Sequence, residues 1–361
     1  MVVPPTRLPK RPDLVAELSE ACERLQIRFS ALDLEGLDIS DYSRRYLGRK
    51  LAGLSGNLTR LSWILAWALS PFEGSLQEVG LIDYGAGTGV LAMLAKEAGV
   101  GTVVYNDIYD LSARDAARIA DALGLRLDGY VVGEVSEIAD WLSTNGKSCQ
   151  VMVSSDVIEH IYDIDQHWRE LDQRLQLESL CLATDANPRN PLRRRAIAAL
   201  QIEAEHHDRV AEYGHKERDA LRSFQEMRRE MIGQADPSLP PDIVDDLVAR
   251  TRGMARWDIA QAIDQYRRTG NLPPLPHHPT NTCDPNTGNW MERLTDPAEL
   301  ARGLARVGFT VNILPGFYGR PQSRLKRLVA NGLNTGLRVL GRRGLWFSPQ
   351  FALWAWRRPR I

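Results

Sequence analysis

The sequence predicts an α/β fold in which a mostly parallel sheet follows helices and is interrupted by a helical insertion. Three observations support this prediction: a strand–glycine turn–helix–strand unit over residues 79–107, apolar residues at helical spacing before it, and charged, helix-patterned residues over 189–289. The 361 residues are 43% hydrophobic and carry a formal net charge of −1. This composition is that of an ordinary globular protein with one large core and an accessory part.

Residues 1–75 precede the predicted sheet and carry two stretches with helical spacing of apolar residues, Asp13 to Ile27 and Ser43 to Leu69. We expect them to form N-terminal capping helices. Arg44, Arg45 and Tyr46 either form a solvated basic helix face, which is the simpler interpretation, or close over a ligand's carboxylate.

The unit over 79–107 has the features of a nucleotide-binding turn. Three alternating glycines, Gly85, Gly87 and Gly89, permit a sharp bend and let a ligand approach without meeting a Cβ atom. A helix beginning near residue 88 or 90 would direct free N–H groups at the ligand, and Asp107, at the tip of the next strand, is placed to take two ribose hydroxyls. Position 90 is valine, and this departure from G-x-G-x-x-G argues against a nicotinamide dinucleotide.

These residues resemble the first motif of the class I S-adenosylmethionine-dependent methyltransferases, in which an acid, here Asp83, precedes alternating glycines. The resemblance continues at Gly133–Glu134, after a third strand at 129–132, and at Ser154–His160, after a fourth. It implies a seven-stranded Rossmann-like sheet whose last strand is antiparallel to the others, with S-adenosyl-L-methionine as cofactor.

The resemblance also implies the residues of the cofactor site. The glycine turn would hold the methionine end and Asp107 the ribose, while Glu134 or the backbone N–H of Val135 would lie near the adenine; the alternative for Glu134 is a solvated loop acid. The expected cofactor-binding residues are Asp83, Gly85, Ala86, Gly87, Gly89, Asp107, Ile108, Glu134, Val135 and Asp156.

The remaining core elements are expected on both sides of the insertion. Residues 76–188 would form the first part of the core and residues 290–361 its completion. The expected elements are a fifth strand at Leu180 to Thr184, a helix at Pro297 to Val307, a sixth strand at Thr310 to Leu314 and a closing strand at Phe351 to Trp356.

The insertion over 189–289 is expected to be mainly helical. Its elements are helices at Asn190 to His215 and Lys216 to Ile232, a helical region from Pro240 to Arg268, and an irregular loop rich in Pro and Asn from Asn271 to Asn289. In open α/β folds such insertions lie over the carboxyl ends of the strands, where ligands bind, so this one is a candidate substrate lid.

Catalysis by methyl transfer needs mainly alignment of donor and acceptor, but a hydroxyl acceptor also needs a base. His160 is the candidate base, and Asp156 and Glu159 are close enough in sequence to orient it or stabilise its charge. The alternative is a structural histidine on the first turn of a helix.

A divalent metal is a second possibility, to which no ligands are assigned. The pattern Asp156-x-x-Glu159-His160 resembles the E-x-x-E-H metal sites of some methyltransferases, and Glu203, His206 and His207 would share one helix face. A solvated acidic and histidine-bearing helix is the simpler interpretation.

Four cysteines, Cys22, Cys149, Cys181 and Cys283, are spread along the chain without a C-x-x-C pair. The spacing indicates neither a zinc cluster nor a disulfide framework, and it favours a reducing cytoplasm. No uninterrupted apolar run reaches the roughly 20 residues that span a bilayer.

The C-terminal segment is strongly basic, because no Asp or Glu follows Glu299. Residues 319–347 alternate Arg and Lys with Leu and Val and then add Trp346 and Phe347. Such a segment suits an anionic membrane surface, here the inner membrane face, but it could equally clamp a phosphate-bearing substrate or RNA, or pack its apolar stripe on the sheet.

The leading functional hypothesis is O-methylation of a small-molecule or glycan acceptor, including a lipid-linked one, with Trp290 available to stack on a ring. An RNA methyltransferase is the first alternative, but nucleic acid is disfavoured by the near-neutral charge and the lack of a separate RNA-binding module. A cofactor-binding protein without turnover is the second. The sequence names neither the acceptor atom nor the oligomeric state.

Overall fold

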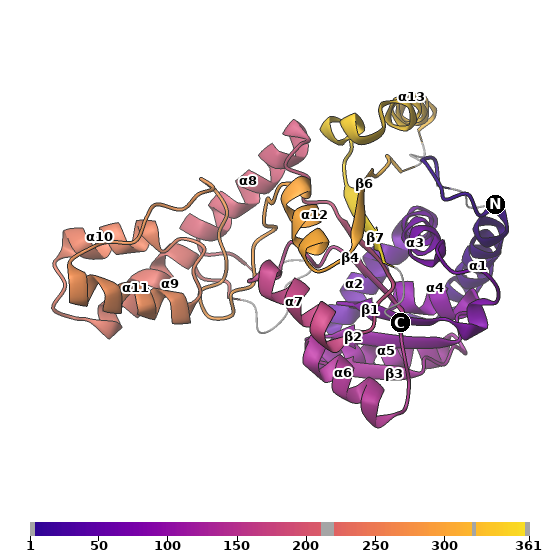
Figure 1. Ribbon diagram of the computed structural model, residues 1–361, viewed down its shortest axis with the longest axis horizontal. Helices are drawn as coiled ribbons and strands as arrows, with labels where there is room; N and C mark the ends of the chain where they lie inside the picture. Colours follow the sequence, from indigo (N-terminus) through magenta and orange to yellow (C-terminus); the bar gives the residue numbers. More distant parts are fainter. Residues whose placement is uncertain (1–3, 211–219, 320–322, 358–361) are drawn as a thin grey trace. The chain divides into compact units, whose positions relative to one another are not determined.

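The computed structural model describes residues 4–210, 220–319 and 323–357, which form two compact units (Figure 1). The first unit comprises residues 1–158, 164–190 and 296–361. The second comprises residues 159–163 and 191–295. The second unit therefore contains most of the stretch that the sequence marks as an insertion, together with a short segment that follows the fourth strand.

The first unit is built on a seven-stranded sheet with the order β3-β2-β1-β4-β5-β7-β6. Strands β1 to β5 pair in parallel, whereas β7 is antiparallel to both β5 and β6. This order is typical of class I methyltransferases, so the predicted sheet with an antiparallel last strand is confirmed. The strands are β1 (Gly80–Tyr84), β2 (Thr102–Asp107), β3 (Gly129–Val132), β4 (Val151–Ser155), β5 (Ser179–Thr184), β6 (Thr310–Pro315) and β7 (Phe351–Trp356).

The strand order turns back at β1, because β2 lies on one side of it and β4 on the other. Ligands of open α/β sheets bind at such a switch point, beyond the carboxyl ends of the strands. The helices of this unit are α1 (Pro12–Ser30), α2 (Asp41–Ala52), α3 (Leu54–Leu69), α4 (Val90–Glu97), α5 (Asp110–Ala122), α6 (Val135–Thr144), α7 (Ile164–Arg174), α12 (Pro297–Arg306) and α13 (Arg324–Leu340), with short 3₁₀ helices η1 (Leu76–Glu78) and η2 (Gly341–Trp346).

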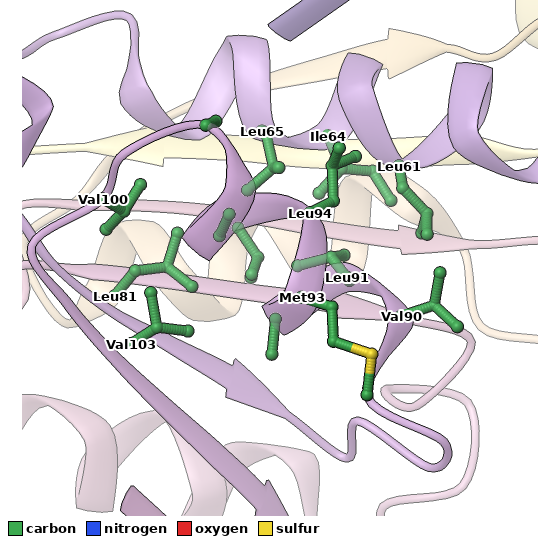
Figure 2. Packing of buried hydrophobic residues seen from close by; sticks show 14 of the residues in the cluster. Leu61, Ile64, Leu65, Leu81, Val90, Leu91, Met93, Leu94, Val100 and Val103 are labelled. Atoms are coloured by element: carbon green, nitrogen blue, oxygen red, sulfur yellow. The ribbon is translucent and has the colours of Figure 1, made fainter. Parts of the chain in front are cut away.

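Helix α3 belongs to the hydrophobic core and is more deeply buried than a capping helix would be. Its side chains Leu61, Ile64 and Leu65 face Leu91 and Leu94 of α4 (Figure 2). The second half of α3 reads LSWILAWAL, which is apolar on every side, so the helix is buried nearly all round. The single helical stretch predicted over residues 43–69 is two helices, α2 and α3, which meet at Gly53.

The second unit contains four helices among its described residues: α8 (Pro191–His206), α9 (Phe224–Ala235), α10 (Pro241–Arg250) and α11 (Arg256–Thr269). The helix predicted to reach His215 ends at His206, and the one predicted from Lys216 begins at Phe224; residues 211–219 lie outside the described part. Beyond the end of α8, Arg209 N–H donates to the carbonyl of Leu221 at 2.6 Å.

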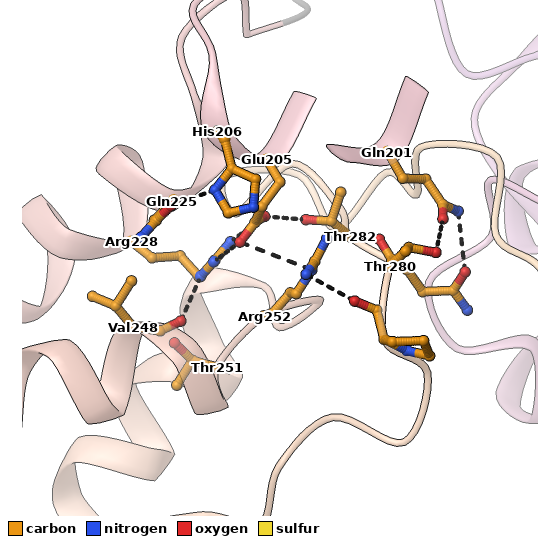
Figure 3. A network of polar contacts seen from close by, with 12 residues as sticks. Gln201, Glu205, His206, Gln225, Arg228, Val248, Thr251, Arg252, Thr280 and Thr282 are labelled. Carbon is orange, nitrogen blue, oxygen red and sulfur yellow. Dashed lines mark hydrogen bonds and ion pairs between the residues drawn. The ribbon is translucent and has the colours of Figure 1, made fainter. Parts of the chain in front are cut away.

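The core of the second unit combines an apolar cluster with a buried ion pair. Glu205 and Arg228 are 3% and 1% exposed, and Arg228 Nη2 lies 2.5 Å from Glu205 Oε1 (Figure 3). The Thr282 hydroxyl donates to the other carboxylate oxygen at 2.7 Å, and the Val248 carbonyl accepts from Arg228 Nε at 3.4 Å. Burial alone would raise the pKa of Glu205, but hydrogen bonds and charge from Arg228 hold it below its ordinary value.

Among the described residues, no helix combines the length and apolarity needed to cross a membrane. The predicted irregular loop over 271–289 contains no helix or strand, although Cys283 forms an isolated antiparallel bridge with Trp290.

Candidate active site

The turn between β1 and α4 adopts a conformation that its glycines make possible. The φ angles are +67° at Gly85, +56° at Gly87 and +74° at Gly89, all in the left-handed region. A Cβ atom on Gly85 would also lie 2.6 Å from Cγ2 of Val157, so the turn packs directly against the segment after β4. Helix α4 then begins at Val90, one of the two predicted positions.

Asp83 lies at the base of this turn and forms a hydrogen bond to the backbone of α4, the helix that follows it. The carboxylate is 2% exposed and accepts the N–H of Ala92, in the first turns of α4, at 2.9 Å. Burial raises the pKa of Asp83 to about 7, and the charge of Lys50 opposes part of that rise. Asp83 therefore braces the start of the helix whose N–H groups are expected to serve the ligand.

Asp107 joins the turn to the end of β2. Its Oδ2 accepts the backbone N–H of Gly87 and its Oδ1 accepts that of Tyr109, both at 2.9 Å. A carboxylate offers about four acceptor positions, and these two hydrogen bonds take two of them. Ala86 N–H donates to the Asn106 carbonyl at 2.8 Å, and the neighbouring Ile108 is 47% exposed.

Helix α2 brings two residues, Tyr46 and Lys50, close to the glycine turn. Tyr46 was considered from the sequence as a residue that closes over a ligand, whereas Lys50 was not. The Tyr46 ring lies 3.8 Å from where a Cβ on Gly87 would stand, and Lys50 Nζ lies 4.6 Å from the centre of that ring. Their spacing of four residues on one helix face is the signal that could have identified Lys50. Arg44, in contrast, donates to the carbonyls of Glu35 and Leu37, so it is a structural residue and not a partner for a ligand's carboxylate.

Glu134 has a role that neither sequence interpretation included, because it caps helix α6. Its backbone N–H donates to Glu137 Oε2 at 2.8 Å, and its own side chain accepts the backbone N–H of Glu137 in a reciprocal capping box. Burial, together with Glu170 and Glu137, raises the pKa of Glu134. The side chain of Val135 is fully buried, so only its backbone remains for a ligand. The Glu-x-x-Glu spacing was the available signal for the cap.

Asp156 pairs with Arg60 of α3, a residue that the sequence analysis did not single out. Arg60 Nη1 lies 2.5 Å from Asp156 Oδ2, and Nη2 lies 2.6 Å from Oδ1. Asp156 has φ +60°, and Asp is one of the few residues other than glycine that tolerate this region. Burial alone would raise the pKa of Asp156, but the charge and hydrogen bonds of Arg60 hold it below its ordinary value.

His160 and Glu159 lie in the second unit, since the chain leaves the first unit after Ile158. His160 is in a turn before α7, and not on the first turn of a helix as one interpretation had it. Its Nδ1 lies 2.8 Å from the Trp290 carbonyl, which can only accept, so Nδ1 carries the proton. In the neutral ring Nε2 is then the basic nitrogen, and it lies 3.8 Å from Glu292 Oε1. Glu159 itself is buried.

Trp290 is a packing residue, contrary to the expectation that it stacks on a substrate ring. It is 9% exposed, its ring stacks on Tyr162 with centroids 5.9 Å apart, and the Arg293 guanidinium lies 4.5 Å from the ring centre. Its indole N–H donates to the Tyr162 carbonyl at 3.1 Å. These contacts leave little ring surface for a ligand.

Of the insertion residues considered for a metal site, Glu203 and His206 share helix α8, but His207 does not. His206 is the last residue of α8, and His207 lies beyond its end. The ring Nδ1 of His206 lies 2.6 Å from Gln225 Oε1, an intramolecular partner within the same unit.

No family model and no curated protein sequence matches this chain. Similar solved structures include an S-adenosylmethionine-dependent methyltransferase from Mesorhizobium loti, with TM-score 0.36 and 13% identity over 80% of this chain and 96% of that one. A plantazolicin methyltransferase in complex with SAH has TM-score 0.37 and 13% identity over 94% of this chain and 99% of that one. A Listeria monocytogenes protein, provisionally assigned to the same enzyme type, has TM-score 0.38 and 12% identity over 84% and 99%. At these scores the matches carry no functional argument for this chain.

Proposed function

We propose that this protein is an S-adenosylmethionine-dependent methyltransferase that methylates a hydroxyl of a small-molecule or glycan acceptor. The observation that carries the proposal is the closure of the glycine turn by Asp107, at the switch point of the sheet. A turn without Cβ atoms, next to a helix N-terminus and an acid at the tip of β2, suits a nucleoside with an attached amino acid.

The donor groups around the turn fit this cofactor. The Thr88 hydroxyl is buried and has no hydrogen-bond partner among the described residues, so it is available to a ligand. Lys50 and the start of α4 bring positive charge to the turn, where the methionine carboxylate would be held. When bound, the cofactor supplies an electrophilic methyl group on a sulfonium.

The chain's own residues would bind the cofactor, orient the acceptor and take up the proton of the acceptor hydroxyl. Alignment of donor and acceptor supplies most of the acceleration in an in-line displacement, and Asp107 with the glycine turn would fix the donor side. His160 Nε2 would accept the proton of the acceptor hydroxyl, because its tautomer is set by the Trp290 carbonyl. Glu292 would stabilise the imidazolium that forms. Residues of the second unit, His160 among them, would then help to select the acceptor.

Calorimetry on the purified full chain tests the cofactor assignment. We expect S-adenosylhomocysteine to bind and NAD⁺ to show no heat. Asp107→Asn turns one acceptor oxygen into a donor facing a backbone N–H, so affinity should fall roughly 10- to 100-fold. Asp110→Asn is the matched control, because Asp110 is exposed and, among the described residues, accepts a hydrogen bond only from the adjacent Leu111 N–H at 2.8 Å. Binding of NAD⁺ instead, or equal effects of both variants, would contradict the assignment.

Incubation with methyl-labelled cofactor and lysate fractions separated into lipid, glycan, RNA and small molecules tests the acceptor class. Label in the small-molecule, glycan or lipid-linked glycan fraction supports the proposal. Label confined to RNA would favour the RNA methyltransferase alternative, and cofactor binding without label in any fraction would favour a protein without turnover.

A further inference from the structure

Helix α13 has two apolar faces, and only one of them packs on other described residues of the protein. Ala330 and Leu337 are 6% and 4% exposed, and the Asn334 side chain exchanges hydrogen bonds with the backbone of Tyr318 at 2.8 and 3.0 Å. These contacts fix the helix on the first unit, where Figure 1 draws it in yellow. Of the apolar residues of this basic helix, only Ala330 and Leu337 are buried among the described residues, so most of its apolar stripe is not packed.

The second apolar face is open to solvent. Val339, Leu325 and Leu328 are 78%, 72% and 70% exposed, far more than core packing would leave. At 3.6 residues per turn these positions fall on one side of the helix, separated from the packed face. The α13 apolar face consists of Leu325, Leu328, Val329, Leu333, Val339 and Leu340. Trp346 and Phe347, just after it in the chain, are also more than half exposed. Contiguous exposure of this kind marks an interaction surface.

Basic side chains border this face, and no acid follows Glu299 in the sequence. They are Arg324, Lys326, Arg327 and Arg338 on the helix and Arg342 and Arg343 after it. Within the described part of the chain, no carboxylate is within ion-pair distance of these six groups. Arg342, Arg343 and Trp346 also line a recess of about 500 Å³, whose wall includes the ion pair of Arg189 and Asp296.

We propose that the α13 apolar face and its basic border bind the surface of an anionic phospholipid membrane. Branched aliphatic side chains at the acyl boundary, with arginines at the phosphates, satisfy both features of the surface at once. RNA would use the arginines, but aliphatic leucines and valines provide no stacking platform for its bases. A second copy would cover the apolar residues but would bring two equally basic borders together. This inference does not depend on the proposed methyl transfer.

Flotation of the full chain with lipid vesicles tests the proposal. We expect the chain to float with vesicles of phosphatidylcholine and phosphatidylglycerol, to float poorly with phosphatidylcholine alone, and to be released by salt. Leu328→Asp and Val339→Asp should each lower the partition coefficient more than about tenfold, because each replaces a buried aliphatic contact with a charge. Arg324→Gln, Arg327→Gln and Arg338→Gln should each lower it roughly fivefold.

The matched control is Ile27→Asp on α1, an apolar residue that is 70% exposed outside the α13 apolar face. It should float as the unchanged protein does, and all variants should keep the same thermal unfolding midpoint because the altered side chains are exposed. Absence of flotation with anionic vesicles, or equal loss in Ile27→Asp, would overturn the proposal. Two further results would overturn it if the chain does not float. One is a concentration-dependent dimer, and the other is salt-sensitive RNA binding, in each case abolished by Leu328→Asp.

Discussion

Arg60 on α3 and Asp156 beyond β4 form a two-pronged ion pair with N–O distances of 2.5 and 2.6 Å. The two residues are 96 positions apart, and the pair holds Asp156 in its left-handed conformation beside the glycine turn. Asp156 also accepts the backbone N–H of Asp185 at 3.1 Å, so its carboxylate ties together α3 and the ends of β4 and β5. The pair is thus a structural connection across the edge of the sheet where the cofactor is proposed to bind.

Arg60→Gln should lower the free energy of unfolding by about 1 kcal/mol, as expected for a well-aligned but partly exposed pair. The pKa of Asp156 is depressed, so this contribution is present above its ordinary value of 3.8 and is lost as pH falls through the folded-state pKa. Denaturant titrations at neutral and acidic pH measure the difference. Arg169→Gln, at an exposed site on α7, should have little effect; a difference that grows on acidification would contradict the prediction.

His160→Ala should lower kcat by roughly 10²- to 10⁴-fold while leaving the calorimetric affinity for S-adenosylhomocysteine nearly unchanged, because a base acts on the acceptor and not on the cofactor. The measurement follows methyl transfer to whichever acceptor the labelled screen identifies. His206→Ala is the matched control in the same unit, since its ring bonds Gln225. Full turnover in His160→Ala would remove this residue from the mechanism.

Asp83→Asn should change the pH dependence of stability. Burial raises the pKa of Asp83 from 3.8 to about 7, so the folded protein keeps a proton that the unfolded chain releases between these values. The free energy of unfolding of the original protein, relative to that of Asp83→Asn, should therefore be greatest below pH 3.8. It should fall by up to about 4 kcal/mol as the pH rises toward 7, and then level off. The asparagine oxygen can still accept the Ala92 N–H. Thermal unfolding across this pH range measures the difference, and a flat difference would contradict the assigned protonation.

Glu205→Gln should destabilise the second unit by about 3–5 kcal/mol, because it leaves the Arg228 charge buried without its counter-charge. Replacing both residues by methionine should restore much of that loss, since neither charge then remains. Hydrogen exchange of α8 and α9 measures the effect in this unit. Arg222→Met, which removes an exposed pair with Glu230, is the control and should have a smaller effect. Equal stability of Glu205→Gln and the original protein would show that the pair contributes nothing.

The strands were predictable because their signals are local. The closing strand at Phe351–Trp356 has the predicted bounds, and the predicted sixth strand at 310–314 is one residue short of β6. Short apolar runs bounded by turn residues carry this information in the sequence itself. Helix ends were harder to predict: the charged pattern after Asn190 fits a helix as far as residue 215, but α8 ends at His206, and Arg209 beyond it bonds the distant Leu221.

In the candidate site, too, some residues were predictable from the local sequence and others were not. Its glycine turn and Asp107 were identified from the sequence, and the structure gives all three glycines positive φ angles and places the Asp107 carboxylate on the Gly87 N–H. Lys50 and Arg60 were not identified, because each meets the site from a helix far away in the sequence. The assignment of the glycine turn and Asp107 to cofactor binding remains a prediction, which the calorimetry tests.

The sequence by itself determined the βαβ unit, the positions of the strands along the chain and the acid-free basic tail, since backbone freedom at glycine, apolar runs and composition are properties of neighbouring residues. Only the tertiary structure decided which charges are neutralised, which apolar faces are covered and which histidine nitrogen carries the proton. Those outcomes depend on partners such as Arg60 for Asp156, Arg228 for Glu205 and the Trp290 carbonyl for His160. Burial and electrostatic interactions act between these residues only once distant segments are in contact, and no local sequence pattern predicts those contacts.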